Sequence, residues 1–267
     1  MNHRRPFIRG RALLELAAGG QTFDWNPIDQ LAARRVERRF HPLVNGVALA
    51  IPRASEDNAD MSATLYSPPA SLAPWAEVVP GVGPVTVDYL LTLPDDGYKY
   101  EVVEGTLVRM AGSGAEESTI AVELTVALHN YVRPRRLGLV TGADGVYKFP
   151  SAETGLVPDV AYFRAERRAQ IANWRRPVPF APDIAVEVAS PDQRPDQLAA
   201  KARLYLSNGT RLVWVVWPAS QHVDVWRADH PSGPVATHNT GERLDCEDVV
   251  PGFAYLVAAV FADPLDE

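Results

Sequence analysis

The chain has almost no cysteine and no long apolar segment. Among its 267 residues Cys246 is the single cysteine, which excludes an internal disulfide and a cysteine-based zinc site. No run of residues approaches the roughly 20 apolar positions that a membrane-spanning helix requires, so we expect no integral membrane segment. The apolar stretch of residues 13–18 is short and includes Glu15, which argues against a secretory signal. Together these features predict a cytoplasmic protein.

Several catalytic signatures are missing as well. The sequence contains no GxSxG nucleophile elbow, no GxxxxGK[ST] phosphate loop and no GxGxxG fingerprint after a strand. Its six histidines lack the spacing of a zinc site. The net charge of −7 argues against non-specific coating of nucleic acid. A nuclease remains compatible with this charge, because a bound metal would neutralise some of its carboxylates.

The character of the sequence changes near residue 83. Residues 1–83 have weak periodicity, paired arginines, an acidic polar patch and Pro68-Pro69. This composition predicts a poorly structured or partly helical extension whose role the sequence does not reveal. Residues 84–267 carry clear strand and helix patterns and predict one α/β domain.

The first half of this domain begins with a hairpin and a helix. Lys99–Val103 and Thr106–Met110 have the pattern of two strands joined by a tight turn. Ser113, followed three residues later by Glu116, matches a capping box and predicts the start of a helix. Residues 138–149 are then expected to form a strand or a bent pair of strands.

The second half supplies the remaining strands. Residues 156–163 and 183–189 each favour a strand, the latter because apolar residues alternate along it. A helix over 195–206 and an almost wholly apolar strand over 212–217 follow. The order helix, three strands, helix, strand predicts an α/β core with a mixed, curved central sheet flanked by helices.

Two carboxylates interrupt apolar strand segments. Asp159 lies in VPDVAYF and Glu187 in IAVEVAS, where an unpaired charge would cost several kcal/mol of desolvation. If the two strands are neighbours, both side chains project from one sheet face and share a divalent cation, for which oxygen ligands favour Mg²⁺ or Mn²⁺. The alternative is that Asp159 and Glu187 are structural and pair with arginines.

Lysine is scarce in this chain, which makes Lys201 conspicuous. It is one of three lysines and flanks the apolar stripe of the helix over 195–206. An ammonium leaning toward two carboxylates could orient or activate an attacking water and stabilise developing charge on phosphorus. A surface lysine whose stem covers apolar groups is the alternative.

Six segments, taken in order, resemble the Uma-two family of predicted endonucleases. They are YEVVEGTLVRM, VPDVAYF, DIAVEVASPDQ, QLAAKARLYLSNG, TRLVWVVWP and VPGFAYLVAAVF. The resemblance covers roughly residues 84–263 and implies the restriction-endonuclease-like PD-(D/E)xK fold, with Asp159 and Glu187 as its two carboxylates. A strict ExK motif would place lysine at Ala189, and Lys201 matches the displaced lysine of this family.

The resemblance also draws attention to other polar residues. Glu101 and Glu104 match acidic positions of the hairpin, and either could support the metal from outside its direct ligands or form a hairpin salt bridge. A histidine that often follows the hairpin is replaced here by Glu116, Glu117 and Ser118.

Three arginines near the end of the first helix are weaker candidates for contacts to the DNA backbone. They are Arg133, Arg135 and Arg136.

The expected function is therefore hydrolysis of DNA phosphodiester bonds by a Mg²⁺- or Mn²⁺-dependent endonuclease. Asp159 and Glu187 would hold the metal, and Lys201 would position or activate the water. A homodimer would supply the two sites that a double-strand cut needs. The alternatives are a nuclease-fold protein that binds nucleic acid or regulates without cutting, and a structural protein whose carboxylates are simply ion-paired.

Overall fold

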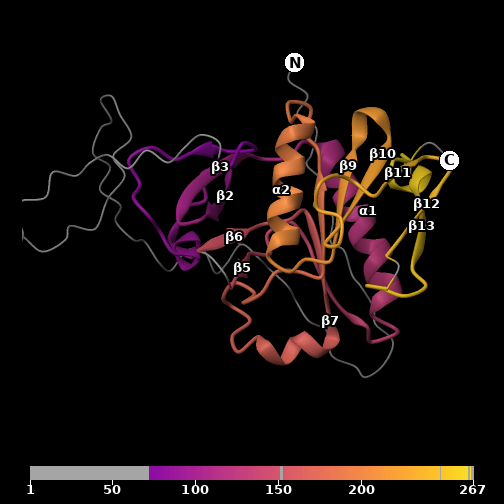
Figure 1. The fold of residues 1–267 in the computed structure, drawn as a ribbon, viewed down its shortest axis with the longest axis horizontal. Helices are drawn as coiled ribbons and strands as arrows, with labels where there is room; N and C mark the ends of the chain where they lie inside the picture. Colours follow the sequence, from indigo (N-terminus) through magenta and orange to yellow (C-terminus); the bar gives the residue numbers. More distant parts are fainter. Residues whose placement is uncertain (1–71, 151–152, 247, 264, 266–267) are drawn as a thin grey trace, which may run out of the picture. The chain divides into compact units, whose positions relative to one another are not determined.

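A computed structural model describes residues 72–150, 153–246, 248–263 and 265 (Figure 1). Every described residue belongs to one compact unit within Asp60–Glu267. Most of the expected N-terminal extension therefore lies outside the described residues. None of the helices in the described part has both the length and the apolar character needed to cross a membrane.

Six strands form the larger sheet, in the order β11-β10-β9-β8-β7-β4. β8 and β9 are parallel, and the other neighbouring pairs are antiparallel, so the sheet is mixed. The bounds are β4 Gly138–Thr141, β7 Val160–Arg164, β8 Ile184–Val188, β9 Leu212–Trp217, β10 His222–Arg227 and β11 Ala236–Asn239.

Two helices, α1 (Ala115–Val132) and α2 (Pro195–Ser207), cover opposite faces of this sheet (Figure 1). In β8, Ile184 and Val186 pack on the α1 side, whereas Ala185 packs on the α2 side. Because side chains alternate along a strand, Glu187 projects to the α2 side as well. α2 is the crossover that a parallel β8–β9 pair requires.

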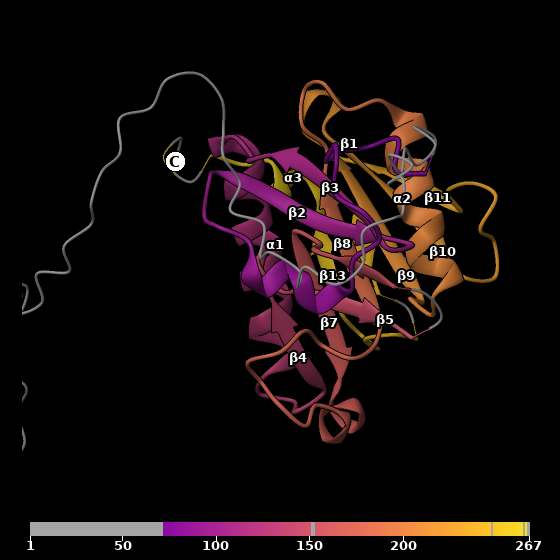
Figure 2. The ribbon, with the colours of Figure 1, turned by 90° about the vertical axis from the view of Figure 1, so that its left-hand side faces the viewer.

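Five strands form a smaller sheet, in the order β1-β3-β2-β6-β5. Its core residues share one apolar cluster with those of α2, and in Figure 2 the β2–β3 hairpin lies in front of β7 and β8. Glu104 and Gly105 form the tight turn of this hairpin, with φ of 48° and 79°, as a primed turn requires. The bounds are β1 Glu77–Val78, β2 Tyr98–Val103, β3 Thr106–Ala111, β5 Tyr147–Phe149 and β6 Thr154–Leu156.

Short elements complete the domain. β12 and β13 pair with each other, and the helix α3 packs with α1 on the face of the larger sheet that α1 covers. The bounds are β12 Arg243–Asp245, β13 Ala254–Leu256, α3 Val257–Val260, and the 3-10 helices η1 Val87–Thr92, η2 Ala165–Gln170 and η3 Pro218–Ser220.

The hairpin, the two long helices and the strands β8 and β9 confirm the sequence-based expectations, but residues 156–163 are not one strand. β6 ends at Leu156 in the smaller sheet, and β7 begins at Val160 in the larger sheet. Pro158 lies in the break and cannot donate a hydrogen bond to a neighbouring strand. β5 and β6 are consequently an insertion, between β4 and β7, that builds part of a second layer.

The predicted capping box is wrong by one residue. α1 begins at Ala115, and its N-cap is Gly114, which makes no side-chain capping hydrogen bond. Glu117 rather than Glu116 is the third residue of the helix, and its Oε2 would lie 2.6 Å from a Cβ placed at Gly114. Glycine at the N-cap therefore lets the Glu117 carboxylate fold back over the first turn of α1.

The ordered domain also begins earlier than residue 84. Ala73 and Trp75 are buried in the cluster that contains α2, and β1 pairs with β3 in the smaller sheet. The sequence pattern places residues 72–83 in the extension, because a two-residue strand and one buried tryptophan leave no periodic signal in the sequence.

Candidate active site

Strand register brings Asp159 and Glu187 to one face of the larger sheet. β7 and β8 are antiparallel, with Val160 opposite Val186, and the Asp159 amide donates to the Val186 carbonyl at 3.0 Å. One step further along this register Asp159 lies opposite Glu187, and directly opposed residues project to the same side. Both side chains line a cleft of about 630 Å³ between the two sheets and α2.

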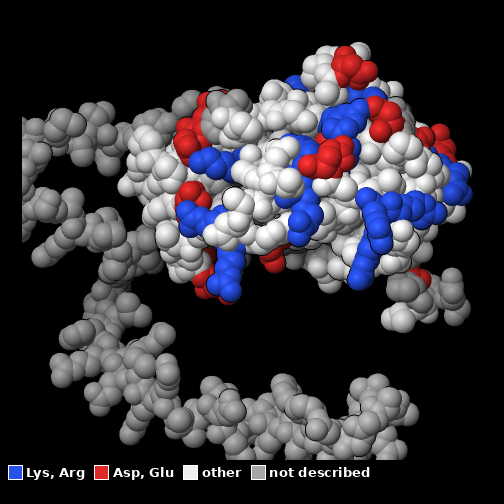
Figure 3. Space-filling view, turned by 90° about the horizontal axis from the view of Figure 1, so that it is seen from below, with Lys and Arg blue, Asp and Glu red and all other residues white. Residues whose placement is uncertain are grey.

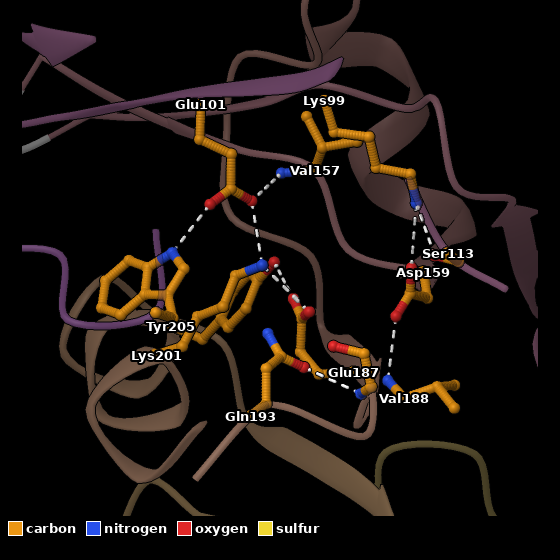
Figure 4. Close-up of polar contacts among 12 residues, drawn as sticks. Lys99, Glu101, Ser113, Val157, Asp159, Glu187, Val188, Gln193, Lys201 and Tyr205 are labelled. Carbon is orange, nitrogen blue, oxygen red and sulfur yellow. Dashed lines mark hydrogen bonds and ion pairs between the residues drawn. The ribbon is translucent and has the colours of Figure 1, made fainter. Parts of the chain in front are cut away.

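Asp159 is held by one cation and one backbone amide. Lys99, from β2, donates from Nζ to Oδ1 at 3.2 Å, and the Val188 amide donates to Oδ2 at 2.9 Å (Figure 4). Lys99 Nζ also lies 3.4 Å from the Ser113 hydroxyl, just before α1. The Asp159 side chain is 14% exposed, so its oxygens remain reachable from the cleft.

Glu187 is held by two residues of α2. Lys201 Nζ donates to Oε2 at 2.9 Å, and the Tyr205 hydroxyl donates to Oε1 at 2.7 Å (Figure 4). Lys201 and Tyr205 are four residues apart, so they lie one above the other on the helix face that meets β8. The ion-pair partners of Asp159 and Glu187 are thus lysines rather than the arginines that a structural role suggested.

Glu101, from β2, is the second partner of Lys201. Its Oε1 lies 3.0 Å from Lys201 Nζ and accepts from the Val157 amide at 2.9 Å, while its Oε2 accepts from the Trp75 indole at 3.0 Å. Glu101 is fully buried and Lys201 is 2% exposed. The Lys201 ammonium is therefore fixed between two carboxylates that come from different sheets.

Burial, opposed by Lys201 and assisted by the nearby carboxylates of Asp159 and Glu101, raises the pKa of Glu187 to about 7. Burial would lower the pKa of Lys201, but Glu101 and Glu187 more than offset this and raise it above its ordinary value. Burial and the adjacent Glu187 raise the pKa of Tyr205 well above its usual range. At neutral pH Lys201 is therefore a charged donor and Tyr205 a neutral one.

Sequence reasoning missed three members of this cluster. Lys99 lies two residues before Glu101, so strand alternation could have placed both on one face of β2. Tyr205 follows Lys201 by one helical turn and could have been found in the same way. Trp75 has no such signal, because it precedes the periodic part of the sequence.

The structure does not bring Glu104 to the cleft. Glu104 is exposed in the β2–β3 turn, and its backbone amide donates to the Thr154 hydroxyl at 3.0 Å. The expectation that Glu104 supports the metal is wrong, because Glu104 lies exposed in the β2–β3 turn and does not line the cleft.

The three candidate arginines, Arg133, Arg135 and Arg136, are also remote from the cleft. They are exposed and follow the last turn of α1, whereas Gly114, at its first turn, lines the cleft. Eighteen helical residues separate these ends by about 27 Å. Figure 3 views the face where α1 ends and η2 lies, with lysine and arginine side chains spread across it. These arginines therefore do not line the cleft, and their contacts to a DNA backbone stay a prediction.

The donor set of the cleft fits a divalent cation. Within the described residues, no group of three or more His, Cys, Asp and Glu side chains is arranged to enclose a metal ion. Mg²⁺, however, is commonly held by one or two carboxylates together with substrate phosphates. Asp159 and Glu187 form such a pair, and each carboxylate oxygen keeps a lone pair beyond the single donor described for it.

A family model described as "Uma2: Putative restriction endonuclease" matches residues 87–260, well over half of the chain. The chain belongs to the Uma2 family. No curated protein matches the chain. Among solved structures, a putative nuclease belonging to DUF820 from Anabaena variabilis is similar, with 22% sequence identity and a TM-score of 0.55. The match covers 67% of this chain and 98% of the other.

These findings confirm the family and the fold class expected from the sequence. The Uma2 domain is a nuclease-like α/β fold with mixed sheets flanked by helices. The family description supports a nuclease function in general terms. Trp75 and β1 lie before the range that the Uma2 model matches, although Trp75 donates to Glu101, the buried carboxylate behind the cleft.

Proposed function

We propose that this protein is a metal-dependent endonuclease that hydrolyses DNA phosphodiester bonds. The observation that carries this proposal is the convergence of Asp159, Glu187 and Lys201 on one cleft, with Glu101 behind them. Membership of the Uma2 family supports the reaction class. The metal, the DNA substrate and the residue roles given below are parts of the proposal.

Asp159 and Glu187 are the proposed ligands of Mg²⁺ or Mn²⁺. When bound, such an ion polarises a phosphoryl oxygen and lowers the pKa of a water molecule in its coordination sphere. The Val188 amide and the Tyr205 hydroxyl keep the two carboxylates in fixed orientations through their hydrogen bonds. This rigidity favours metal binding because no side chain has to be ordered first.

Lys201 is proposed to stabilise negative charge that develops on the phosphate. Its raised pKa keeps the ammonium protonated at neutral pH, so it does not serve as a general base. Glu101 anchors Lys201 from the side opposite Glu187 and thereby sets where its charge lies. A fixed cation needs no reorganisation as the reaction proceeds, and this is the main source of electrostatic catalysis.

Lys99 is proposed to contact the scissile phosphate. Its side chain is 25% exposed, whereas that of Lys201 is 3% exposed, so Lys99 is the lysine that a ligand in the cleft meets first. If Asp159 engages a metal, Lys99 loses part of its attraction to this carboxylate and becomes available to an anion.

A plasmid-cleavage assay tests the proposal. Supercoiled DNA is incubated with Mg²⁺, Mn²⁺ or EDTA and with wild type, Asp159→Ala or Glu104→Gln. Wild type and Glu104→Gln are expected to cut when metal is present, and Asp159→Ala is expected to lose at least about 10²-fold in rate. Cleavage that survives in EDTA or in Asp159→Ala would contradict the proposal.

The form of the cleaved plasmid distinguishes a homodimer from a single acting site. Direct formation of linear DNA indicates two cooperating sites, as in a homodimer, and nicked circles indicate one site acting alone. DNA binding without cleavage under every metal condition would instead favour a nuclease-fold protein that binds nucleic acid without cutting.

A further inference from the structure

A second groove runs along α1 and meets the main cleft at the candidate active site. It encloses about 360 Å³, and the two cavities share Lys99, Ser113, Glu117 and Asp159. A strand that passes the reacting centre in the main cleft therefore has a continuous path into this groove.

The lining beyond these shared residues is uncharged. It consists of small or apolar side chains with two hydroxyls, and we call these residues the α1 groove. They are Ser118, Ala121, Val122, Thr125, Val126, Gly142 and Ala143.

Two β-branched side chains in the α1 groove are unusually exposed for their type. Val122 is 58% exposed and Val126 is 46% exposed. On the opposite wall Gly142 and Ala143 are small, and a Cβ added at Gly142 would meet nothing within 4 Å. The groove therefore offers open, apolar walls that water covers in the free protein.

We propose that the α1 groove binds unpaired nucleotides of the substrate strand on one side of the scissile phosphate. The proposal rests on the proposed nuclease function and deepens it by naming a single-stranded segment as substrate. A duplex presents mainly phosphates and sugars on its outside, and these need cations, whereas the described lining supplies Lys99 alone. Unpaired bases present apolar faces, which suit valine and alanine walls.

The length of the α1 groove suits a short strand segment. From Glu117 to Val126 the helix rises by about 14 Å, at 1.5 Å per residue. That distance spans about four nucleotides at the stacked spacing of roughly 3.4 Å, and fewer if the strand is extended. The phosphate at the entrance would then lie beside Lys99 and Asp159, where the two cavities join.

Opposite substitutions at one position provide the test. Val122→Tyr adds a ring on which a base can stack, and Val122→Glu adds a charge that repels the strand. Asn130 is exposed on the same helix outside the groove, so Asn130→Tyr and Asn130→Glu are matched controls. Binding of a short fluorescein-labelled single strand is measured by anisotropy without metal and at about 0.15 M ionic strength, which limits long-range effects of charge.

We expect Val122→Tyr to tighten binding and Val122→Glu to weaken it, each by about tenfold, or about 1.4 kcal/mol. Both Asn130 variants should stay within about twofold of wild type. The same sequence as a blunt duplex should bind wild type more weakly than the single strand. Val122 variants that match wild type, Asn130 variants that change as much, or preferred binding of the duplex would each overturn the proposal.

A small phosphodiester substrate tests the nuclease function independently of strand binding in the α1 groove. Bis(p-nitrophenyl) phosphate is a phosphodiester too short to reach from the reacting centre along α1. If the protein is a nuclease, Val122→Glu should hydrolyse this ester within about twofold of wild type while its KM for the oligonucleotide rises. Failure of wild type to hydrolyse any phosphodiester would refute the nuclease function, and the binding measurements would still decide whether the α1 groove takes a strand.

Discussion

Replacing Lys201 by methionine should destabilise the protein as well as impair catalysis. Methionine keeps an apolar stem of similar length but leaves Glu101 and Glu187 facing each other without the cation between them. Both carboxylates are almost wholly buried, at 0% and 6% exposure, so water cannot replace the lost ammonium. Removing one partner of a buried ion pair typically costs about 3–5 kcal/mol, and here two carboxylates lose the same partner.

The stability that Lys201→Met loses relative to wild type should increase as pH rises. The pKa of Glu187 is already raised to about 7 with Lys201 present, and loss of the cation raises it further. A carboxyl whose pKa is higher in the folded than in the unfolded state stabilises the fold at low pH. This stabilisation is lost as pH rises from about 4.5, the pKa in the unfolded chain, through the pKa in the folded protein. Lys201→Met should therefore be least destabilised near pH 5 and most destabilised near pH 8.

Urea unfolding at pH 5 and pH 8 measures both effects. Lys148→Met is the matched control, because its ammonium pairs with Glu153 on the surface, where the side chains are 34% and 45% exposed. Such exposed pairs contribute about 0–1 kcal/mol. If Lys201→Met loses no more stability than Lys148→Met at pH 8, the ion pairs of Lys201 with Glu101 and Glu187 do not stabilise the fold, and the reasoning is refuted.

Three further predictions follow from the same contacts. Trp75→Phe keeps a smaller aromatic ring but removes the indole N–H that donates to Glu101, so the free energy of unfolding should fall by about 1–3 kcal/mol and kcat should drop more than KM rises; unchanged kinetics would refute a link from Trp75 to Lys201. Mn²⁺ affinity measured by calorimetry should increase up to about pH 7 and then level off, because the ion displaces a proton from Glu187; a flat profile between pH 5 and 7 would contradict this. Deleting residues 1–71 should leave thermal unfolding of the domain nearly unchanged, whereas deleting 1–83 also removes Trp75 and β1 and should cost about 3 kcal/mol or more; equal stability of the two truncated chains would show that Trp75 and β1 are dispensable.

The elements that the sequence predicts well are those with strong local signals. β8 alternates, α2 has Pro195 at its first turn and Gly209 just after its end, and β9 is almost wholly apolar. Two of these elements carry Glu187 and Lys201, so the sequence alone predicts the central part of the candidate site. Asp159 could be added because its strand pattern and its carboxylate are both visible.

The remaining features depend on contacts between distant parts of the chain. Nothing local to Lys99 or Glu101 shows that the hairpin docks over β7 and β8, so their roles in holding Asp159 and Lys201 appear only in three dimensions. The sequence does not reveal the split at Pro158, because Leu156 and Val157 precede the apolar residues of β7 in one nearly continuous run, and apolarity alone does not tell which sheet a strand joins. The position of the candidate arginines could not be predicted for a similar reason, since clustering in sequence says nothing about the end of α1 at which the cleft opens.

The docking of the β2–β3 hairpin onto the larger sheet has a consequence for how the protein folds. The hydrogen bonds and ion pairs that assemble the cleft close chain segments of 26 to 60 residues between Trp75, Lys99, Glu101, Val157 and Asp159. We expect contacts of such high sequence separation to form late, because their loop-closure entropy is lost before they contribute stability. A partly folded chain, in which the hairpin has not yet reached β7 and β8, lacks the arrangement of charges on which phosphodiester cleavage is proposed to depend. Acquisition of activity should therefore coincide with the last cooperative step of folding.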